Sequence, residues 1–211
     1  MSTLNHTRCR KCGTCCRSNS PVLHIQDLQL IKKGILSGKQ LMVLRKGEPA
    51  MDNIQGRLVL LKCELIKIRG KNPNLWHCLL HDQSTNLCTI HESRPAQCQA
   101  LKCWDSEQIR TTYQDQTMSR SHLFSSGSAM EDIIRMHEET CPVDTFVKFT
   151  QQALKDDSHA IGELDTMIQR DENIRKAFQE KTGASQELTE YYLGRSFLSL
   201  KDWVIKFIRS S

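Results

Sequence analysis

Four cysteines lie within eight residues near the start of the sequence. The stretch CRKCGTCC contains Cys9, Cys12, Cys15 and Cys16, and its other residues are basic, polar or glycine rather than apolar. A C-x2-C turn brings two thiolates onto one metal ion, with Zn–S distances of about 2.3 Å. A glycine such as Gly13 permits the positive φ that these turns often need. The spacing predicts metal binding, and the C-x2-C-x2-C run is also a ferredoxin-like spacing.

The adjacent pair Cys15 and Cys16 needs an explanation of its own. Adjacent side chains point to opposite sides of an extended backbone. We therefore expect the two thiols to bind two neighbouring metal centres, or one of them only to pack against the protein.

A second group of cysteines follows in the stretch WHCLLHDQSTNLCTIHESRPAQCQALKC. Its four thiols and the four of the first group make eight, the number that two four-thiolate sites need. The predicted metal ligands are Cys9, Cys12, Cys15, Cys16, Cys78, Cys88, Cys98 and Cys103.

The remaining two of the ten cysteines have apolar or proline neighbours. A disulfide scaffold is typical of small secreted domains, whereas this chain has 211 residues and no apolar signal segment at its N-terminus. We expect Cys63, in the run LVLLKCELI, and Cys141, before Pro142, to be buried structural thiols.

The two cysteine groups together resemble the YkgJ-type CxxCxxCC cysteine-cluster family, described as a zinc- or iron-chelating domain. The resemblance rests on CRKCGTCC at 9–16, on Asp27-Leu28 at the start of the following helix, on Arg94-Pro95 and on the four later cysteines. It covers roughly residues 9–105. The resemblance implies that these cysteines bind a metal, and it permits zinc and iron alike.

The identity of the metal depends on the donor atoms. Four thiolates suit a zinc ion and an iron–sulfur cluster alike. His77, His81 and His91 sit beside the cysteines and could replace a thiolate, although a histidine in such a position is more often solvated or hydrogen-bonded to a ligand. The all-thiolate set favours an iron–sulfur cluster slightly over zinc.

Basic residues surround the first cysteine group. Residues 1–129 carry a net charge of +9 and residues 130–211 carry −4. Arg8, Arg10, Lys11 and Arg17 have no acidic residue among them, so they would lower thiol pKa values and favour the metal-bound form. The competing interpretation is a basic patch for nucleic acid, but the patch is modest and has few aromatic residues beside it.

The elements that would position the cysteines read as a small α+β domain over residues 1–105. Apolar residues at helical spacing predict a helix that starts near Ile25 and ends near Gly34. GRLVLLKCELIKIRG predicts a strand, and NLWHCLL predicts a second one after the turn signal at Pro73. The resulting β-hairpin, together with short helices, would place Cys78 next to the metal.

The rest of the chain is predicted to be helical. Residues 106–129 read as a polar connector and residues 130–211 as a helical region, with Gly183 at a helix C-terminus. The last stretch, SFLSLKDWVIKFIRS, is amphipathic. We expect these helices to pack on each other and on the cysteine domain, or to offer a surface to a protein partner.

Several classes of protein do not fit the sequence. No segment approaches the ~20 apolar residues of a membrane span, and nucleotide-binding and hydrolase motifs are absent from the sequence, so no enzyme is supported. We expect a cytoplasmic location, where thiols stay reduced. The hypothesis is a cysteine-cluster metalloprotein, either a redox protein or an accessory protein to a modification enzyme. The alternative is a structural zinc protein that mediates protein or nucleic-acid interaction.

Overall fold

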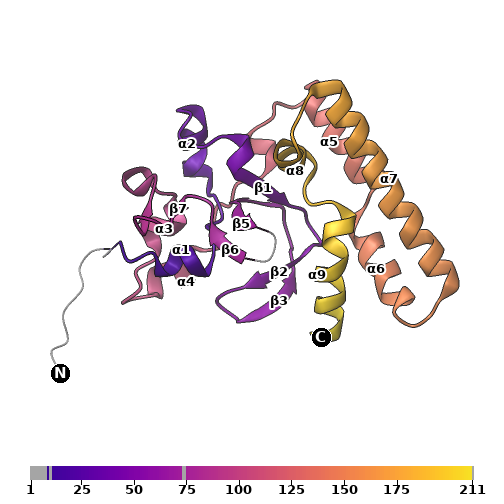
Figure 1. Ribbon diagram of the computed structural model, residues 1–211, viewed down its shortest axis with the longest axis horizontal. Helices are drawn as coiled ribbons and strands as arrows, with labels where there is room; N and C mark the ends of the chain where they lie inside the picture. The colour runs from indigo at the N-terminus through magenta and orange to yellow at the C-terminus, as the bar shows by residue number, and fades with distance from the viewer. Residues whose placement is uncertain (1–8, 10, 73–74, 211) are drawn as a thin grey trace. The chain divides into compact units, whose positions relative to one another are not determined.

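The computed structural model describes residues 9, 11–72 and 75–210 (Figure 1). Their contacts divide the chain into two compact units. Unit 1 takes the described residues up to Leu41 together with Ile66–Met118, and unit 2 takes Met42–Leu65 and the described residues from Ser119 onward. The strands β1 (Leu41–Leu44) and β4 (Leu65–Ile68) contain two of the points where the chain passes between the units. The domain borders at 105 and 129 stay a prediction.

Unit 1 is built from short helices and two antiparallel strand pairs. The helix that was predicted near Ile25 is a 3-10 turn followed by one helical turn, and it ends before Gly34, whose φ is +69°. The helices and 3-10 turns are α1 (Thr14–Ser18), η1 (Ile25–Asp27), α2 (Leu28–Lys32), η2 (Gly38–Gln40), η3 (His91–Ser93), α3 (Ala96–Ala100) and α4 (Glu107–Thr112). The strands are β5 (Gly70–Asn72), β6 (Leu75–Cys78), β7 (His81–Asp82) and β8 (Leu87–Cys88).

Backbone hydrogen bonds join three distant segments of unit 1. The Leu23 amide donates to the Ile66 carbonyl at 2.8 Å, Ile66 donates to Met118 at 3.2 Å, and Met118 donates back to Leu23 at 2.8 Å. All three side chains have no exposed surface. Because buried backbone groups need partners, this triangle fixes the scaffold on which the cysteine loops lie.

The two strand pairs carry the middle cysteines. A hairpin that carries Cys78 is present, since β5 pairs with β6 and Gly70 lies opposite Cys78, but β5 begins only where the predicted strand ends, at Gly70. The turn signal at Pro73 falls outside the described residues. A second pair, β7 with β8, places His81 directly opposite Cys88.

The strand predicted over GRLVLLKCELIKIRG is interrupted. Its first part is β3 (Arg57–Leu60), which pairs with β2 (Pro49–Asp52) in unit 2, and its last part is β4. Cys63 lies in the bend between β3 and β4 and is exposed, so the prediction that it is a buried structural thiol is wrong. The apolar run hid the bend because both flanking strands are rich in Leu and Ile.

Unit 2 contains the predicted helical region, which is confirmed. Its helices are α5 (Ala129–Thr140), α6 (Val143–Ala153), α7 (Ser158–Thr182), α8 (Gln186–Leu193) and α9 (Phe197–Ser210), preceded by the 3-10 turn η4 (Arg120–His122). The longest, α7, ends at Gly183 with φ +67°, as its sequence predicts. Figure 1 shows α6 and α7 running side by side.

The core of unit 2 lies among α6, α7 and α9. Phe146 and Phe197 stack with ring centroids 4.1 Å apart, and both are fully buried. Leu200 and Val204 of α9 are also fully buried, so most of the amphipathic stripe of α9 is used for packing inside the unit. Cys141 is buried in the same core, as predicted.

Helices and small antiparallel strand pairs give the chain an α+β fold, and the predicted fold class is confirmed. Among the described residues, no helix combines the length and the apolar character needed to cross a membrane.

Candidate metal centre

The first cysteine group forms the start of unit 1. Gly13, with φ +70°, is the residue before α1, and Cys15 and Cys16 both lie in this helix, which packs on β6. The two thiols are therefore not in extended backbone, and the premise that they must point to opposite sides is wrong. Five residues are too short for a helical pattern to be visible in the sequence.

The adjacent thiols of Cys15 and Cys16 influence each other's pKa. A hydrogen bond from the Cys16 thiol to Cys15 lowers the pKa of Cys15 to about 6, although burial opposes the shift. A protonated His81 would act in the same direction as the hydrogen bond. The pKa of Cys16 is raised, because its thiol donates this bond, because it is partly buried, and because the thiolates of Cys78 and Cys88 lie near it.

Cysteines from the two strand pairs and from α3 join this doublet. Burial raises the pKa of Cys78 to about 11, and the thiolates of Cys88 and Cys15 add to the shift. Burial also raises the pKa of Cys98, with further contributions from Cys78, Cys15 and Cys88. These mutual effects mean that the thiols lie near one another. We call the five residues Cys15, Cys16, Cys78, Cys88 and Cys98 the thiol cluster.

Two buried charged residues position the thiol cluster. Lys67 is 6% exposed, its ammonium donates to Asn19 at 2.9 Å, and its charge lowers the pKa of Cys78 against the effect of burial. Asp27 is 4% exposed and accepts hydrogen bonds from the amides of His24 and Ala96, at 2.9 and 2.8 Å. Because Ala96 begins α3, Asp27 fixes the helix that carries Cys98.

The first cysteine loop is fastened to the β7–β8 turn. The side-chain amide of Asn86 donates to the Cys12 carbonyl at 2.9 Å, and its oxygen lies 3.1 Å from His81 Nε2. Gly13 lies against the same pair: a Cβ atom added to it would be 2.3 Å from His81 Nε2 and 2.6 Å from Asn86 Oδ1. Only glycine fits this position without displacing its neighbours.

The other predicted ligands are exposed, as Cys15 is too. Cys12 lies 3.3 Å from the Thr14 hydroxyl, which lowers the pKa of its thiol, while the nearby thiolate of Cys15 opposes this shift. The Lys11 amide approaches Cys9 at 3.4 Å. Cys103 is exposed on a turn closed by the backbone bridge between Lys102 and Asp105.

The basic residues near the first cysteines have partners within unit 1. Lys11 forms an ion pair with Glu92 at 3.2 Å, and Arg17 donates to the side-chain oxygen of Asn86. Arg8 and Arg10 lie outside the described residues. Lys67 and Asn86 carry functional contacts that the sequence analysis missed, because neither their burial nor their distant partners are visible in a local pattern.

A second candidate group lies in unit 2. The ligand atoms of His137, Cys141 and Asp171 all lie within 4.8 Å of one another, and all three residues are fully buried. Within the described ranges, this is the one set of three or more such side chains that meets this distance. Among the described residues, no three thiols of the thiol cluster lie within this distance of one another. Four thiolates on a zinc ion lie roughly 3.8 Å apart, so metal binding would draw the members of the thiol cluster closer together.

The surroundings of this triad are those of a buried polar network. His137 Nε2 and Asp171 Oδ1 are 2.7 Å apart, while Asp171 Oδ2 accepts from Arg175 at 2.9 Å and from the Phe197 amide at 2.8 Å. Burial, together with the charges of Arg45 and Arg175, lowers the pKa of His137. Because Asp171 is already satisfied and arginines surround the triad, a cation is disfavoured there.

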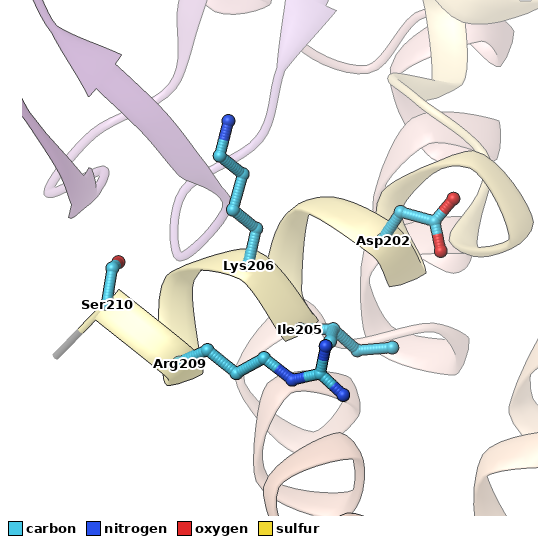
Figure 2. Close-up of a pocket in the computed structure, with 5 residues that line it drawn as sticks. All are labelled: Asp202, Ile205, Lys206, Arg209 and Ser210. Carbon is cyan, nitrogen blue, oxygen red and sulfur yellow. The ribbon is translucent and has the colours of Figure 1, made fainter.

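The hollow on α9 does not bear on metal binding. Its volume is about 410 Å³, and Asp202, Ile205, Lys206, Arg209 and Ser210 line it. Figure 2 shows that these side chains project from a single helix in several directions. The hollow has no thiol or imidazole in its lining. The predicted protein partner for the C-terminal helices stays a prediction.

The donor set of the thiol cluster fits a metal. Thiolates that raise one another's pKa repel each other when ionised, and a divalent cation turns this repulsion into attraction. Among the described residues all ten cysteines are free of disulfides, so the thiols are available. Unit 1 gathers cysteines from loops, strand pairs and a helix into one cluster. This arrangement is typical of metal-binding proteins.

Comparison with protein families agrees with this class. The chain matches the CxxCxxCC family, described as a "putative zinc- or iron-chelating domain", over residues 8–142. It therefore belongs to this family, as the cysteine spacing suggested, and metal binding is the activity that the family description supports. Searches of curated proteins and of solved structures found no match.

Proposed function

We propose that the chain binds one metal centre in unit 1, with Cys15, Cys78, Cys88 and Cys98 as its principal thiolate ligands. The observation that carries this proposal is the surroundings of Cys98, because burial and the nearby thiolates of Cys78, Cys15 and Cys88 together raise the pKa of its thiol. Four separate elements, α1, β6, β8 and α3, supply these residues. One ion or cluster would therefore cross-link the whole of unit 1.

The adjacent cysteines Cys15 and Cys16 favour one metal centre over two. Cys16 donates to Cys15 and responds to the same thiolates, Cys78 and Cys88, so both members of the doublet face one cluster. Cys16 acts on the ligand next to it rather than on a distant centre. Cys9, Cys12 and Cys103 complete the predicted set of eight cysteine ligands, and their binding to the metal remains a prediction.

The biochemical role depends on what the centre contains. A zinc ion has no redox chemistry, so it would make unit 1 a structural module whose folding is coupled to metal binding. An iron–sulfur cluster held by four thiolates would make the protein a redox or accessory protein. Nucleic-acid binding is less well supported, because Lys11 and Arg17 have partners within unit 1.

The experiment that tests the proposal is anaerobic purification followed by metal analysis, sulfide analysis and a visible spectrum on one sample. One zinc ion per chain and no absorption band would identify the structural module. Iron with acid-labile sulfide and a brown colour would identify the redox protein. Protein without any bound metal, which also takes up none on titration with Zn²⁺ or Fe²⁺, would refute the proposal.

Single cysteine variants then locate the centre. We expect Cys98→Ser to lose at least half of the bound metal, because a hydroxyl is a poor substitute for a thiolate on zinc or iron. Cys63→Ser is the matched control, since Cys63 is exposed in the bend between β3 and β4. Cys141→Ser should also keep the metal. Loss of metal in Cys141→Ser alone would move the site to the His137, Cys141 and Asp171 triad.

A further inference from the structure

His81 occupies a position in the thiol cluster that the cysteine pattern does not reveal. It lies on β7 directly opposite Cys88, and it is 2% exposed. Side chains that face each other across an antiparallel pair have Cβ atoms about 5 Å apart. The imidazole therefore lies next to the Cys88 side chain, on the same face of this strand pair.

The hydrogen bonds of Asn86 fix the protonation of the His81 ring. The Asn86 nitrogen donates to the Cys12 carbonyl, and its oxygen accepts from Arg17, so the atom that faces His81 is an oxygen. An oxygen acceptor requires His81 Nε2 to carry the hydrogen. In a neutral ring Nδ1 then carries a lone pair.

This lone pair has no hydrogen-bond partner. His81 Nδ1 is buried, and the described part of the chain offers it no donor. A buried polar atom without a partner destabilises the fold, whereas a metal-binding histidine typically donates its second ring N–H to a carbonyl or carboxylate. The Asn86 oxygen is such an acceptor.

We propose that His81 Nδ1 is a metal ligand in place of one of the four principal thiolates, that Asn86 is its positioning residue, and that the centre is a zinc ion held by this nitrogen and the remaining three thiolates. The inference rests on the proposed function, because it needs a metal in unit 1. One nitrogen and three sulfurs are a common structural zinc set. A four-thiolate iron–sulfur cluster uses no imidazole.

The test is zinc K-edge X-ray absorption on the full chain loaded with Zn²⁺. We expect one nitrogen at about 2.0 Å and three sulfurs at about 2.3 Å. The variant His81→Ala should weaken Zn²⁺ affinity, measured by chelator competition, and should shift the visible bands of the Co²⁺-substituted protein. His77→Ala, on β6, is the matched control and should change neither the Zn²⁺ affinity nor the Co²⁺ bands.

A second variant separates coordination from packing. Asn86→Ala removes the hydrogen-bond acceptor but keeps the imidazole. We therefore expect a 10- to 100-fold loss of Zn²⁺ affinity with the same nitrogen and sulfur ligands on the zinc ion. A four-sulfur shell in the wild type would overturn the His81 inference and leave the metal centre in place. Iron with acid-labile sulfide would overturn the zinc assignment, whereas absence of any metal would refute the proposed function instead.

Discussion

Gly13 shows how one missing side chain serves the metal centre. Its φ of +70° is costly for any other residue, and its Cα faces His81 and Asn86 so closely that a Cβ atom would overlap both side chains. Gly34 has nearly the same φ, +69°, but no atom lies within 4 Å of its virtual Cβ. A comparison of the two glycines therefore separates the effect of the positive φ from the effect of close contact with neighbouring side chains.

We predict that Gly13→Ala weakens metal binding at least tenfold, because the added methyl group displaces the imidazole and the amide that positions it. Gly34→Ala should lower the free energy of unfolding by about 1 kcal/mol through its backbone alone and keep the metal affinity. Chelator competition and urea unfolding measure the two quantities. Equal effects of both substitutions on metal affinity would show that Gly13 matters only for its backbone.

The sequence reveals the cysteines of the candidate site but not the contacts that position them. The cysteines are visible because thiols at C-x2-C spacing are rare outside metal sites. The role of His81 depends on Asn86. The side chain of Asn86 is in turn held by the carbonyl of Cys12, which lies 74 positions before Asn86 in the sequence. A local pattern contains no such contact, and the same holds for the burial of Lys67.

Among the elements, the turn η1 connects the first half of unit 1 with α3. The carboxylate of Asp27 accepts from the amides of His24 and Ala96, and its burial raises the pKa of this carboxyl although both hydrogen bonds oppose the shift. Removing the carboxylate would leave two buried amides without acceptors.

We predict that Asp27→Ala lowers the free energy of unfolding of unit 1 by about 2–4 kcal/mol and weakens metal binding through Cys98. Gln26→Ala changes the neighbouring exposed residue of the same turn and should have little effect. Hydrogen exchange of the α3 amides, compared between the two variants, reports the effect directly. Unchanged protection in Asp27→Ala would mean that α3 is held by other contacts.

Long periodic elements were predictable and short ones were not. The helices of unit 2 repeat apolar residues over many turns, and Gly183 ends α7 where its conformational freedom is needed. By contrast, α1 has five residues, and its conformation depends on Gly13 and on packing against β6. The bend that exposes Cys63 is equally invisible, because β3 and β4 have similar compositions.

At the scale of the whole molecule, unit 2 has its own buried network. Burial alone would raise the pKa of Asp171, but hydrogen bonds from His137 and the charge of Arg175 outweigh it and hold the pKa below its usual range. The Arg175 guanidinium also donates to the carbonyls of Gly194 and Arg195 at 2.8 and 2.9 Å. Asp171 thus connects α5, α7 and the start of α9.

We predict that Asp171→Asn lowers the free energy of unfolding of unit 2 by about 3–5 kcal/mol, because it leaves Arg175 buried without its counter-charge. A carboxyl with a lowered pKa stabilises the folded state above its unfolded pKa of about 4, so the difference from wild type should shrink as the pH falls below that value. Urea unfolding between pH 3.5 and 7 measures it, with Glu172→Gln, an exposed neighbour, as control. A pH-independent difference would contradict this electrostatic account.

The fold class of the molecule followed from its patterns, but its long-range pairs did not. Glu48 is fully buried between Arg45 and Arg195, and its bond to Arg195 Nε, at 2.8 Å, spans 147 positions. A charged residue in a short segment after β1 reads as solvated surface in the sequence. Only the folded chain brings its partner to it.

That pair also sets an order of events during synthesis. All residues of unit 1 have been added once Met118 is made, whereas Glu48 must wait for Arg195. At common translation rates the intervening residues take roughly 4 to 15 s. The nascent chain therefore carries all the thiols of the proposed metal centre for several seconds before Arg195 can reach Glu48, and a metal has this time to bind before unit 2 is complete.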